Sequence, residues 1–175
     1  MELKQVKDLM IPLDKYPHIP YWFTLRQAMV ELEKSELDVN GKKSLPRILL
    51  IFDEKYQLLG LTRRRDIMRG LEPQFLAHKP VEAKKQLYDI KIDPNLVEMS
   101  YDTLMESIKE RAERPVSDVM LPIAATLDYN DHLIKAIYEM VDNNISLIPV
   151  IKDDKIVGVL RSVEVFHEIA TFVIS

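Results

Sequence analysis

The chain contains the same sequence pattern twice. Residues 6–12, VKDLMIP, return as residues 116–122, VSDVMLP. Each copy continues with an amphipathic helical pattern, an apolar run and a polar turn, and closes on a glycine, Gly60 in the first copy and Gly158 in the second. Such a repeat decides the architecture first, because each unit leaves an apolar face that its neighbour has to cover. We therefore expect two related units that pack on each other, with a cleft for a ligand between them.

Composition limits the classes of function. The 175 residues suffice for one compact domain or two small subdomains that share a core. The net charge of −4 argues against general binding of nucleic acids, whose phosphates require a basic surface. The absence of cysteine excludes disulfides, thiolate zinc sites and Cys nucleophiles. With no signal-peptide pattern in MELKQ and no run near about 20 apolar residues, we expect a cytoplasmic protein without nucleic-acid or membrane partners.

Periodicity predicts the same order of elements in both units, β-α-β-β-α. In the first unit we expect a helical turn over 5–10, an extended segment from His18, a helix over 25–37 capped by Thr24, strands near 47–53 and 57–62, and a helix near 63–71. In the second unit we expect an extended piece near 123–127, a helix near 131–143 capped by Asn130, strands near 147–152 and 155–160, and a helix over 162–174.

A segment of different composition separates the two units. Residues 72–115 contain little Gly or Ser and many Leu, Ile and charged residues, which is not typical of a flexible linker. Apolar residues recur with a helical period from Asp102 to Arg114. We therefore expect a mainly helical insert, so that the first repeat covers 1–71, the insert 72–115 and the second repeat 116–175. The insert either covers an edge of the paired units or is an arm that docks a partner or extends a dimer.

The repeated pattern resembles the CBS domain family, the tandem modules named after cystathionine β-synthase. The resemblance rests on both V-x-D-(L/V)-M-x-P segments, on ISLIPV at 145–150, and on the closing segments GLTRRRDI at 60–67 and GVLRSVEV at 158–165. It leaves out the insert. The resemblance implies an α+β fold in which two repeats are paired by a pseudo-two-fold axis, and it implies assembly of two such chains into a homodimer.

Members of this family commonly bind AMP, ADP, ATP or S-adenosylmethionine between their repeats and regulate an attached or partner protein. The resemblance therefore implies a regulatory module that senses an adenosine compound, needs no cofactor and acts on a separate protein. The alternative is a ligand-free module for dimerisation or protein interaction. We do not expect an enzyme or a metal site, because the sequence shows no nucleophile–base set and its four histidines lie far apart.

The resemblance also implies which residues touch the ligand. In members that bind adenosine compounds, a Thr or Ser three residues after the glycine contacts phosphate, and an acid three residues later binds the ribose. The acid positions hold Asp66 and Glu164, whereas the phosphate positions hold Arg63 and Arg161 instead of a hydroxyl. A carboxylate suits the ribose diol because it accepts two hydrogen bonds. The apolar walls for the adenine are implied at Ile11, Ile48, Leu121, Ile145 and Leu147.

The arginines at the start of the helix near 63–71 carry a second signal. A helix N-terminus is electropositive, so that cations there are unfavourable and an anion is favoured. A guanidinium also pairs with phosphate through two parallel hydrogen bonds. We therefore expect Arg63 and Arg64 to contact the phosphate of an adenosine ligand whose ribose is bound by Asp66. The other interpretation is a solvated face on which nearby carboxylates offset the arginines.

Overall fold

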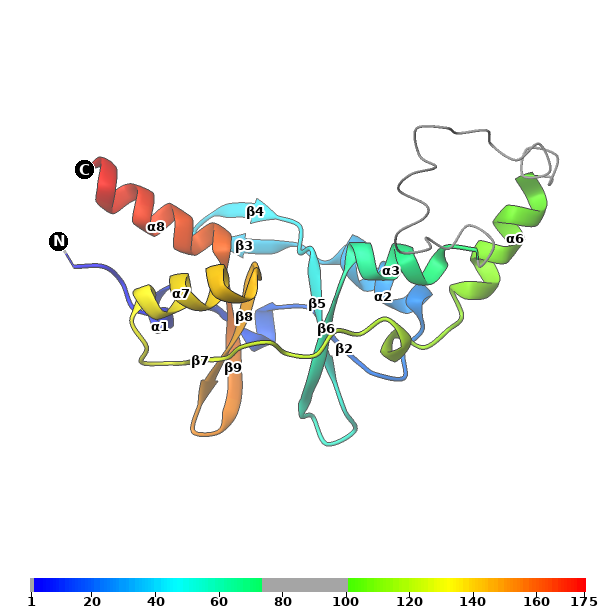
Figure 1. The fold of residues 1–175 in the computed structure, drawn as a ribbon, viewed down its shortest axis with the longest axis horizontal. Coiled ribbons are helices and arrows are strands. Elements are labelled where there is room, and N and C mark those ends of the chain that lie inside the picture. Colours follow the sequence, from blue (N-terminus) through cyan, green and yellow to red (C-terminus); the bar gives the residue numbers. More distant parts are fainter. Residues whose placement is uncertain (1, 74–100) are drawn as a thin grey trace.

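The computed structural model describes residues 2–73 and 101–175 and has the mixed α+β fold expected from the sequence (Figure 1). Up to residue 73 the elements are α1 (Val6–Leu9), β1 (Ile11–Pro12), the 3-10 turn η1 (Leu13–Lys15), β2 (His18–Pro20), α2 (Leu25–Lys34), β3 (Leu37–Val39), β4 (Lys42–Ser44), β5 (Ile48–Phe52), β6 (Leu58–Arg63) and α3 (Arg64–Leu71). From residue 101 they are α6 (Tyr101–Arg111), the 3-10 turn η3 (Val116–Asp118), β7 (Leu127–Asp128), α7 (Leu133–Asn143), β8 (Leu147–Lys152), β9 (Lys155–Arg161) and α8 (Ser162–Ile174).

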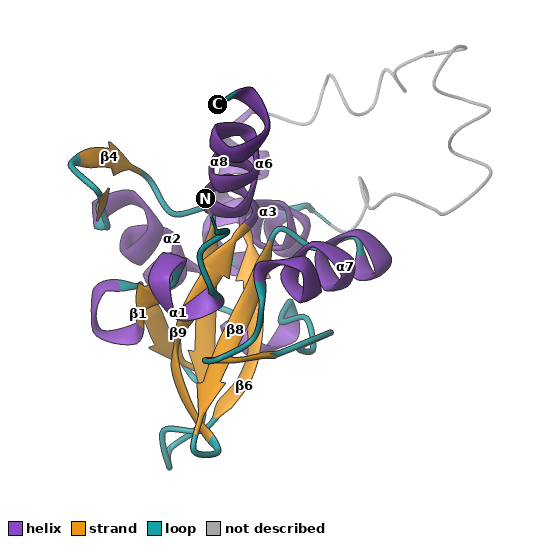
Figure 2. Ribbon diagram, turned by 90° about the vertical axis from the view of Figure 1, so that its left-hand side faces the viewer, coloured by secondary structure: helices purple, strands orange, loops and turns teal. Residues whose placement is uncertain are grey.

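Within residues 2–73 and 101–175 the strands form two sheets and a separate hairpin, β3–β4. The sheet orders are β2-β5-β6 and β1-β9-β8-β7. In each sheet a short strand, β2 or β7, runs parallel to the first strand of an antiparallel hairpin, β5–β6 or β8–β9. Figure 1 shows the two hairpins side by side, and Figure 2 shows the helices gathered toward the ends of the strands away from the hairpin tips. The predicted β-α-β-β-α order is therefore confirmed in both units.

The first long helix is shorter than predicted. Thr24 caps its start as expected, because its hydroxyl accepts a hydrogen bond from the backbone N–H of Gln27. The helix ends at Lys34 rather than at residue 37, and the chain continues into the β3–β4 hairpin. Leu37 is buried in a cluster between the units. The free energy gained by this burial exceeds the weak preference of residues 35–37 for continuing the helix. In the second unit the N-cap position of α7 is held by His132, two residues after the predicted cap Asn130, and the His132 side chain makes no capping hydrogen bond.

Along the central strands β5 and β8, alternate residues are buried in different hydrophobic cores. Leu49 and Ile51 of β5 pack against α2 in the core of the first unit, and Ile148 and Val150 of β8 pack against α7 in the core of the second. The remaining positions face the other unit and form a central cluster of Ile11, Tyr16, Leu37, Ile48, Leu50, Phe52, Leu147 and Val159. Because side chains alternate along a strand, both faces of each sheet are buried and the two units share one interior.

The units exchange the segments that open each repeat. Val6 of α1 is buried in the core of the second unit, whereas Val116 is buried in the core of the first. Strand β1 pairs with β9, and Leu121 exchanges two backbone hydrogen bonds with Leu61 of β6, at 2.8 and 3.0 Å. The repeated V-x-D-x-M-x-P segment is therefore the crossing segment in both copies. The division of the chain at residues 71 and 115 stays a prediction. The first segment of each repeat packs in the core of the other unit, so the boundaries of the sequence repeats differ from those of the packed units.

Two repeated glycines stand where the crossing segments pass. A Cβ atom on Gly60 would lie 2.4 Å from the carbonyl oxygen of Leu121, and one on Gly158 would lie 2.3 Å from that of Ile11. Both distances are far below van der Waals contact, so only glycine admits the second backbone at these points.

Of the predicted insert, residues 72–73 and 101–115 lie within the described part of the chain. Helix α6 falls inside the segment expected to be helical, and residues 74–100 lie outside the described part. The Nε of Arg111 donates to the carbonyl oxygen of Gly70 at 3.0 Å. The backbone N–H of Leu25 donates to the carbonyl oxygen of Arg114 at 2.9 Å. This end of the insert is thus attached to helices α2 and α3 of the first unit.

We expect Gly60→Ala and Gly158→Ala each to lower the free energy of unfolding by about 1–3 kcal/mol, because the added methyl group forces the crossing strand away. Urea denaturation followed by circular dichroism measures the change. The exposed Lys155→Ala on β9 is the control and should leave the stability within about 0.5 kcal/mol of the parent. Wild-type stability of both glycine variants would contradict the crossing geometry.

Candidate ligand clefts

Three of the clefts in the described part of the chain lie between the units, and two of these, clefts 1 and 2, occupy positions related by the internal repeat. Cleft 1 has a volume of about 380 Å³ and is lined by Ile48, Leu61, Arg63, Leu121, Pro122, Ile123, Ala124, Ala125, Asn144, Ile145, Ser146, Leu147 and Pro149. Cleft 2 has a volume of about 440 Å³ and is lined by Tyr16, Ser44, Leu45, Arg47, Ile48, Arg64, Ser146, Leu147, Arg161, Ser162 and Val163. Both volumes lie in the range of about 300–1,000 Å³ that small-molecule sites occupy.

Cleft 1 is mainly apolar. The crossing segment 121–125 supplies one wall, and side chains at the starts of β5 and β8 supply the others. Arg63, Asn144 and Ser146 are the residues with polar side chains among the described ones that line it. An apolar slot with a few polar groups at its edge suits a flat heterocycle with a polar substituent.

The arginine at the edge of cleft 1 is paired within the chain. Asp66 occupies the third position of α3 and is fully buried, at 0% exposure. Its Oδ2 accepts from the backbone N–H and the Nε of Arg63, both at 2.9 Å, and its Oδ1 accepts from Nη2 of Arg63 at 3.0 Å and Nη2 of Arg69 at 3.2 Å. Burial raises the pKa of Asp66, but these hydrogen bonds and the two positive charges outweigh it, and the net pKa is lowered.

The second copy repeats this ion pair at cleft 2. The Nε of Arg161 donates to both oxygens of Glu164, at 2.9 and 3.1 Å, and its Nη2 donates to Oε1. The Nη1 of Arg161 also donates to Oγ of Ser44, at 3.4 Å, and so joins the second unit to the β3–β4 hairpin of the first. Figure 1 shows that hairpin extending toward the start of α8. Both acids implied for ribose binding thus already have guanidinium partners.

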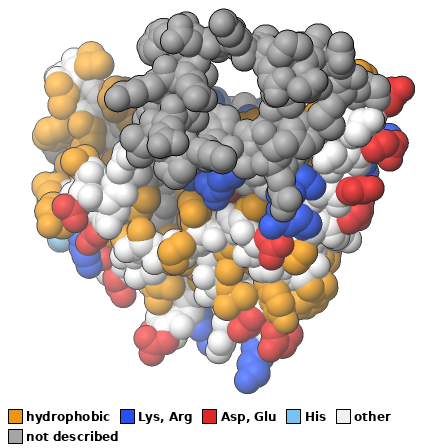
Figure 3. Space-filling model, turned by 45° about the vertical axis from the view of Figure 1, so that its right-hand side comes forward, with side chains coloured by type: hydrophobic (Ala, Val, Ile, Leu, Met, Phe, Trp, Pro, Cys, Tyr) orange, Lys and Arg blue, Asp and Glu red, His pale blue; other side chains and the backbone are white. Residues whose placement is uncertain are grey.

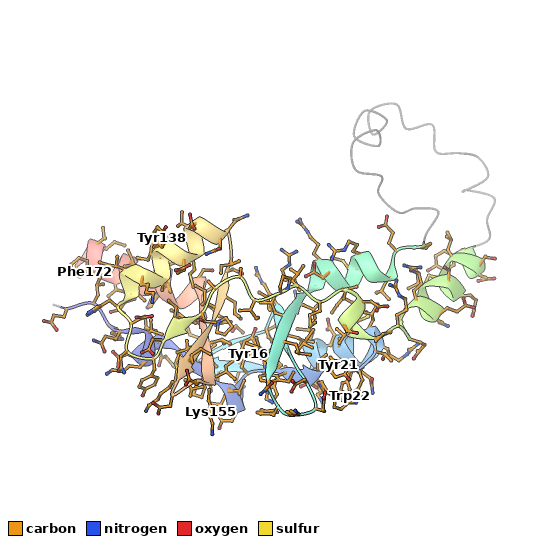
Figure 4. The ribbon with its side chains drawn as sticks, turned by 60° about the horizontal axis from the view of Figure 1, so that its bottom comes forward. Tyr16, Tyr21, Trp22, Tyr138, Lys155 and Phe172 are labelled. Atoms are coloured by element: carbon orange, nitrogen blue, oxygen red, sulfur yellow. The ribbon has the colours of Figure 1, made fainter. Side chains whose placement is uncertain are left out.

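The wall between the clefts is rigid and shared. Ile48 and Leu147 line both clefts and belong to the central cluster. Tyr16, which Figure 4 places in the middle of the molecule, is 2% exposed, and its hydroxyl donates to the carbonyl oxygen of Ile48 at 2.5 Å. Burial raises the pKa of Tyr16 well above its ordinary value, although Arg161 acts in the opposite direction. The phenol is therefore a neutral hydrogen-bond donor at physiological pH.

Most of the residues implied as ligand contacts line a cleft: Arg63, Leu121 and Ile145 in cleft 1, Arg64 and Arg161 in cleft 2, and Ile48 and Leu147 in both. Ile11 lies outside both clefts, because β1 pairs with β9 and carries this side chain into the central cluster. Asp66 and Glu164 lie beneath the arginines rather than on a cleft surface.

Sequence reasoning missed several cleft residues, above all Ser44, Arg47 and Ser146. A signal for Arg47 exists in the repeat itself. Ile48 pairs with Arg63 and Leu147 pairs with Arg161 at equivalent registers, so that Arg47 corresponds to Ser146. Ser44 has no such signal, since it reaches cleft 2 through a hairpin that the periodicity did not predict.

Comparison with known families gives a direct match for the second unit. Residues 116–171 match the CBS domain family. The second unit is therefore similar to a CBS domain. The solved structures extend the likeness to the fold of the whole chain, and a comparison with curated proteins found no match.

Three of these structures define the CBS-pair fold. CBSX2, a CBS-pair protein from Arabidopsis thaliana, is 16% identical with a TM-score of 0.65, and the alignment covers 99% of both chains. A CBS domain-containing protein from Bacillus anthracis is 20% identical with a TM-score of 0.65, with coverage of 96% and 94%. CBSX2 in complex with AMP is 17% identical with a TM-score of 0.60, with coverage of 96% and 97%. The chain therefore has the fold of a tandem CBS pair, as the resemblance implied.

A fourth structure is longer than this chain. The cytosolic domain of the Mg²⁺ channel MgtE in complex with ATP is 14% identical with a TM-score of 0.58. The alignment covers 93% of this chain and 48% of that one.

Other classes of site find no support in the part of the chain that the structure describes. Residues 2–73 and 101–175 contain no group of three or more His, Cys, Asp or Glu side chains placed to hold a metal ion. No helix in these ranges is both long and apolar enough to cross a membrane. On the face shown in Figure 3, acidic and basic side chains lie mixed around exposed hydrophobic ones.

The lowered pKa of Asp66 predicts a specific pH dependence. A carboxyl whose pKa is lower in the folded state stabilises the fold above its ordinary pKa of about 3.9, and this contribution is lost as the pH falls further. We expect Asp66→Asn to cost about 1–2 kcal/mol at pH 7, with the difference from the parent shrinking below about pH 4. Urea unfolding at pH 7, 5 and 3 measures it. Asp142→Asn, exposed on α7, is the control, and a cost for Asp66→Asn that is equal at all three values would refute the ion-pair assignment.

Proposed function

We propose that this chain is a regulatory module that binds an adenosine compound, AMP, ADP, ATP or S-adenosylmethionine, between its CBS repeats and acts on a separate protein. The observation that carries the proposal is a pair of open, partly apolar clefts, each with an arginine of the repeated motif in its lining. Support also comes from the shared fold, since solved structures with this fold include a complex with AMP and a complex with ATP.

The adenine would lie in the apolar slot of cleft 1, against Ile48, Leu121 and Ile145. The phosphate would take the guanidinium of Arg63, which lies at the edge of that slot. Asp66 then loses one partner, and the ribose hydroxyls replace it as hydrogen-bond donors. The buried carboxylate of Asp66 would then accept hydrogen bonds both without the ligand, from Arg63, and with the ligand, from the ribose hydroxyls.

A ligand in either cleft would touch both units. In cleft 1 it would contact Leu61 and Arg63 of the first unit and the segment 121–125 of the second. It would therefore favour one relative orientation of the units, to the extent that its affinities for the alternative orientations differ. The change would be passed to a separate, cytoplasmic partner, and regulation rather than catalysis would be the output.

A ligand-free assembly module is the second candidate. It is favoured by the two ion pairs, because Asp66 and Glu164 are already satisfied within the chain. It is also favoured by exposed apolar side chains on neighbouring helices, which include Tyr138 of α7 and Phe166 of α8. Figure 4 places Tyr138 and Phe172 together at one end of the molecule.

Isothermal calorimetry with AMP, ADP, ATP and S-adenosylmethionine separates the two candidates. We expect at least one compound to bind below millimolar concentration, and Asp66→Asn to weaken it about tenfold or more because the amide replaces one ribose acceptor with a donor. Asp142→Asn is the control. No heat with any compound at millimolar concentration, or unchanged binding by Asp66→Asn, would favour the assembly module.

The exposed face of α7 and α8 predicts a homodimer. Phe166 is 76% exposed and Val173 is 72% exposed, and burying such side chains against a second copy stabilises association. Light scattering at micromolar concentration should give twice the mass of one chain, and Phe166→Glu should shift the protein toward monomer. Met68→Glu, on α3 of the other unit, is the matched control. A monomeric wild-type protein would refute this expectation.

A further inference from the structure

The two clefts differ in charge. Arg63 is the only cation among the described residues that line cleft 1, and Asp66 binds its guanidinium through two nitrogens. Cleft 2 is lined by Arg47, Arg64 and Arg161. Of these, Arg161 is paired with Glu164.

The other two arginines of cleft 2 lack such a partner. Within residues 2–73 and 101–175, no carboxylate lies within ion-pair distance of Arg47 or Arg64. The one hydrogen bond found for Arg64 is long, 3.4 Å from Nη2 to the carbonyl oxygen of Pro46. No acidic side chain is among the described residues that line cleft 2. Cleft 2 therefore carries two positive charges that no acidic side chain among its described lining residues offsets.

The start of α8 adds to this positive field. Ser162 and Val163, the first two residues of this 13-residue helix, line the cleft, and the side chain of the N-cap residue Arg161 makes no capping hydrogen bond. The backbone N–H of Ser162 already donates to the carbonyl oxygen of Ser146 at 2.8 Å, so the start of α8 contributes the positive end of the helix dipole rather than this N–H group. The hydroxyls of Ser44 and Ser146 supply further hydrogen-bonding groups in the same lining. Two arginines, two serine hydroxyls and the start of a helix are groups of the kind that bind phosphate in proteins.

We propose that cleft 2 is a second nucleotide site, separate from cleft 1, that takes an adenosine di- or triphosphate, and that Arg47 and Arg64 determine the number of phosphates that this cleft prefers. This inference rests on the proposed function. Each added phosphate brings negative charge to two guanidinium groups that have no ionic partner among residues 2–73 and 101–175. Cleft 1, with its single arginine neutralised by Asp66, suits an adenosine compound with little or no phosphate charge.

The arrangement also links phosphate number to the position of the units. Arg47 and Arg64 belong to the first unit, whereas Arg161 and the start of α8 belong to the second. A polyphosphate between them is attracted from both sides and holds the units together across cleft 2. A monophosphate has fewer oxygens with which to contact both sides.

Calorimetry with adenosine, AMP, ADP, ATP and inorganic tripolyphosphate tests the inference. We expect the affinity to rise from AMP to ATP, and Arg47→Gln and Arg64→Gln each to weaken ATP about tenfold or more while AMP changes far less. Arg65→Gln is the matched control, because Arg65 is exposed on the same helix and lines neither cleft. Raising the salt concentration should weaken ATP more than AMP. All three arginines are exposed, and unfolding curves of the variants verify that they fold.

The possible outcomes separate the two proposals. Equal affinity for AMP and ATP, or the same loss for Arg65→Gln as for Arg64→Gln, overturns the inference and leaves adenosine binding intact. Binding of tripolyphosphate that depends on Arg47 and Arg64, without binding of any adenosine compound, supports the anion site and overturns the proposed function. No heat with any of the five compounds overturns both.

Discussion

The structure depends on two backbone crossings. At each one a repeated segment of one unit runs against a glycine of the other, and the available space admits no side chain at Gly60 or Gly158. These crossings place the first helix of each repeat in the core of the other unit, as the burial of Val6 and Val116 shows. Neither unit completes its core alone, because part of each core is supplied by the other repeat. The fold is therefore one cooperative body built from two sequence repeats.

The clefts follow from this exchange. Because each crossing segment leaves its own unit, the start of the hairpin that follows it faces the other unit and forms the shared wall at Ile48 and Leu147. The same arginine–acid pair stands beside both clefts, with Arg63 holding Asp66 and Arg161 holding Glu164. Symmetry of the repeats makes the clefts alike in shape and position. The clefts differ in charge because equivalent positions of the two repeats hold different residues, such as Arg47 in the first repeat and Ser146 in the second.

The sequence predicted the fold well because its signals are local and repeated. Helical periods, the Thr24 cap and the polar turns placed most elements within a few residues. The β3–β4 hairpin was missed because its burial at Leu37 depends on Leu147, about a hundred residues away along the chain. Ile11 was implied as a ligand contact but packs in the central cluster, since its strand pairs with a strand of the other repeat. Pairing between strands that are far apart in the chain cannot be predicted from the pattern of neighbouring residues.

By itself the sequence determined the two-fold repetition, the order of elements and the positions of the motif arginines and acids, because these are properties of neighbouring residues. Only the tertiary structure decided what those charged groups do. It placed Arg63 and Arg161 beside clefts that the other unit helps to line, and it brought Arg47 and Arg64 to the start of α8 in the opposite unit. The physical reason is that the charge in a cleft depends on distances across the fold, which are set by how the two units pack.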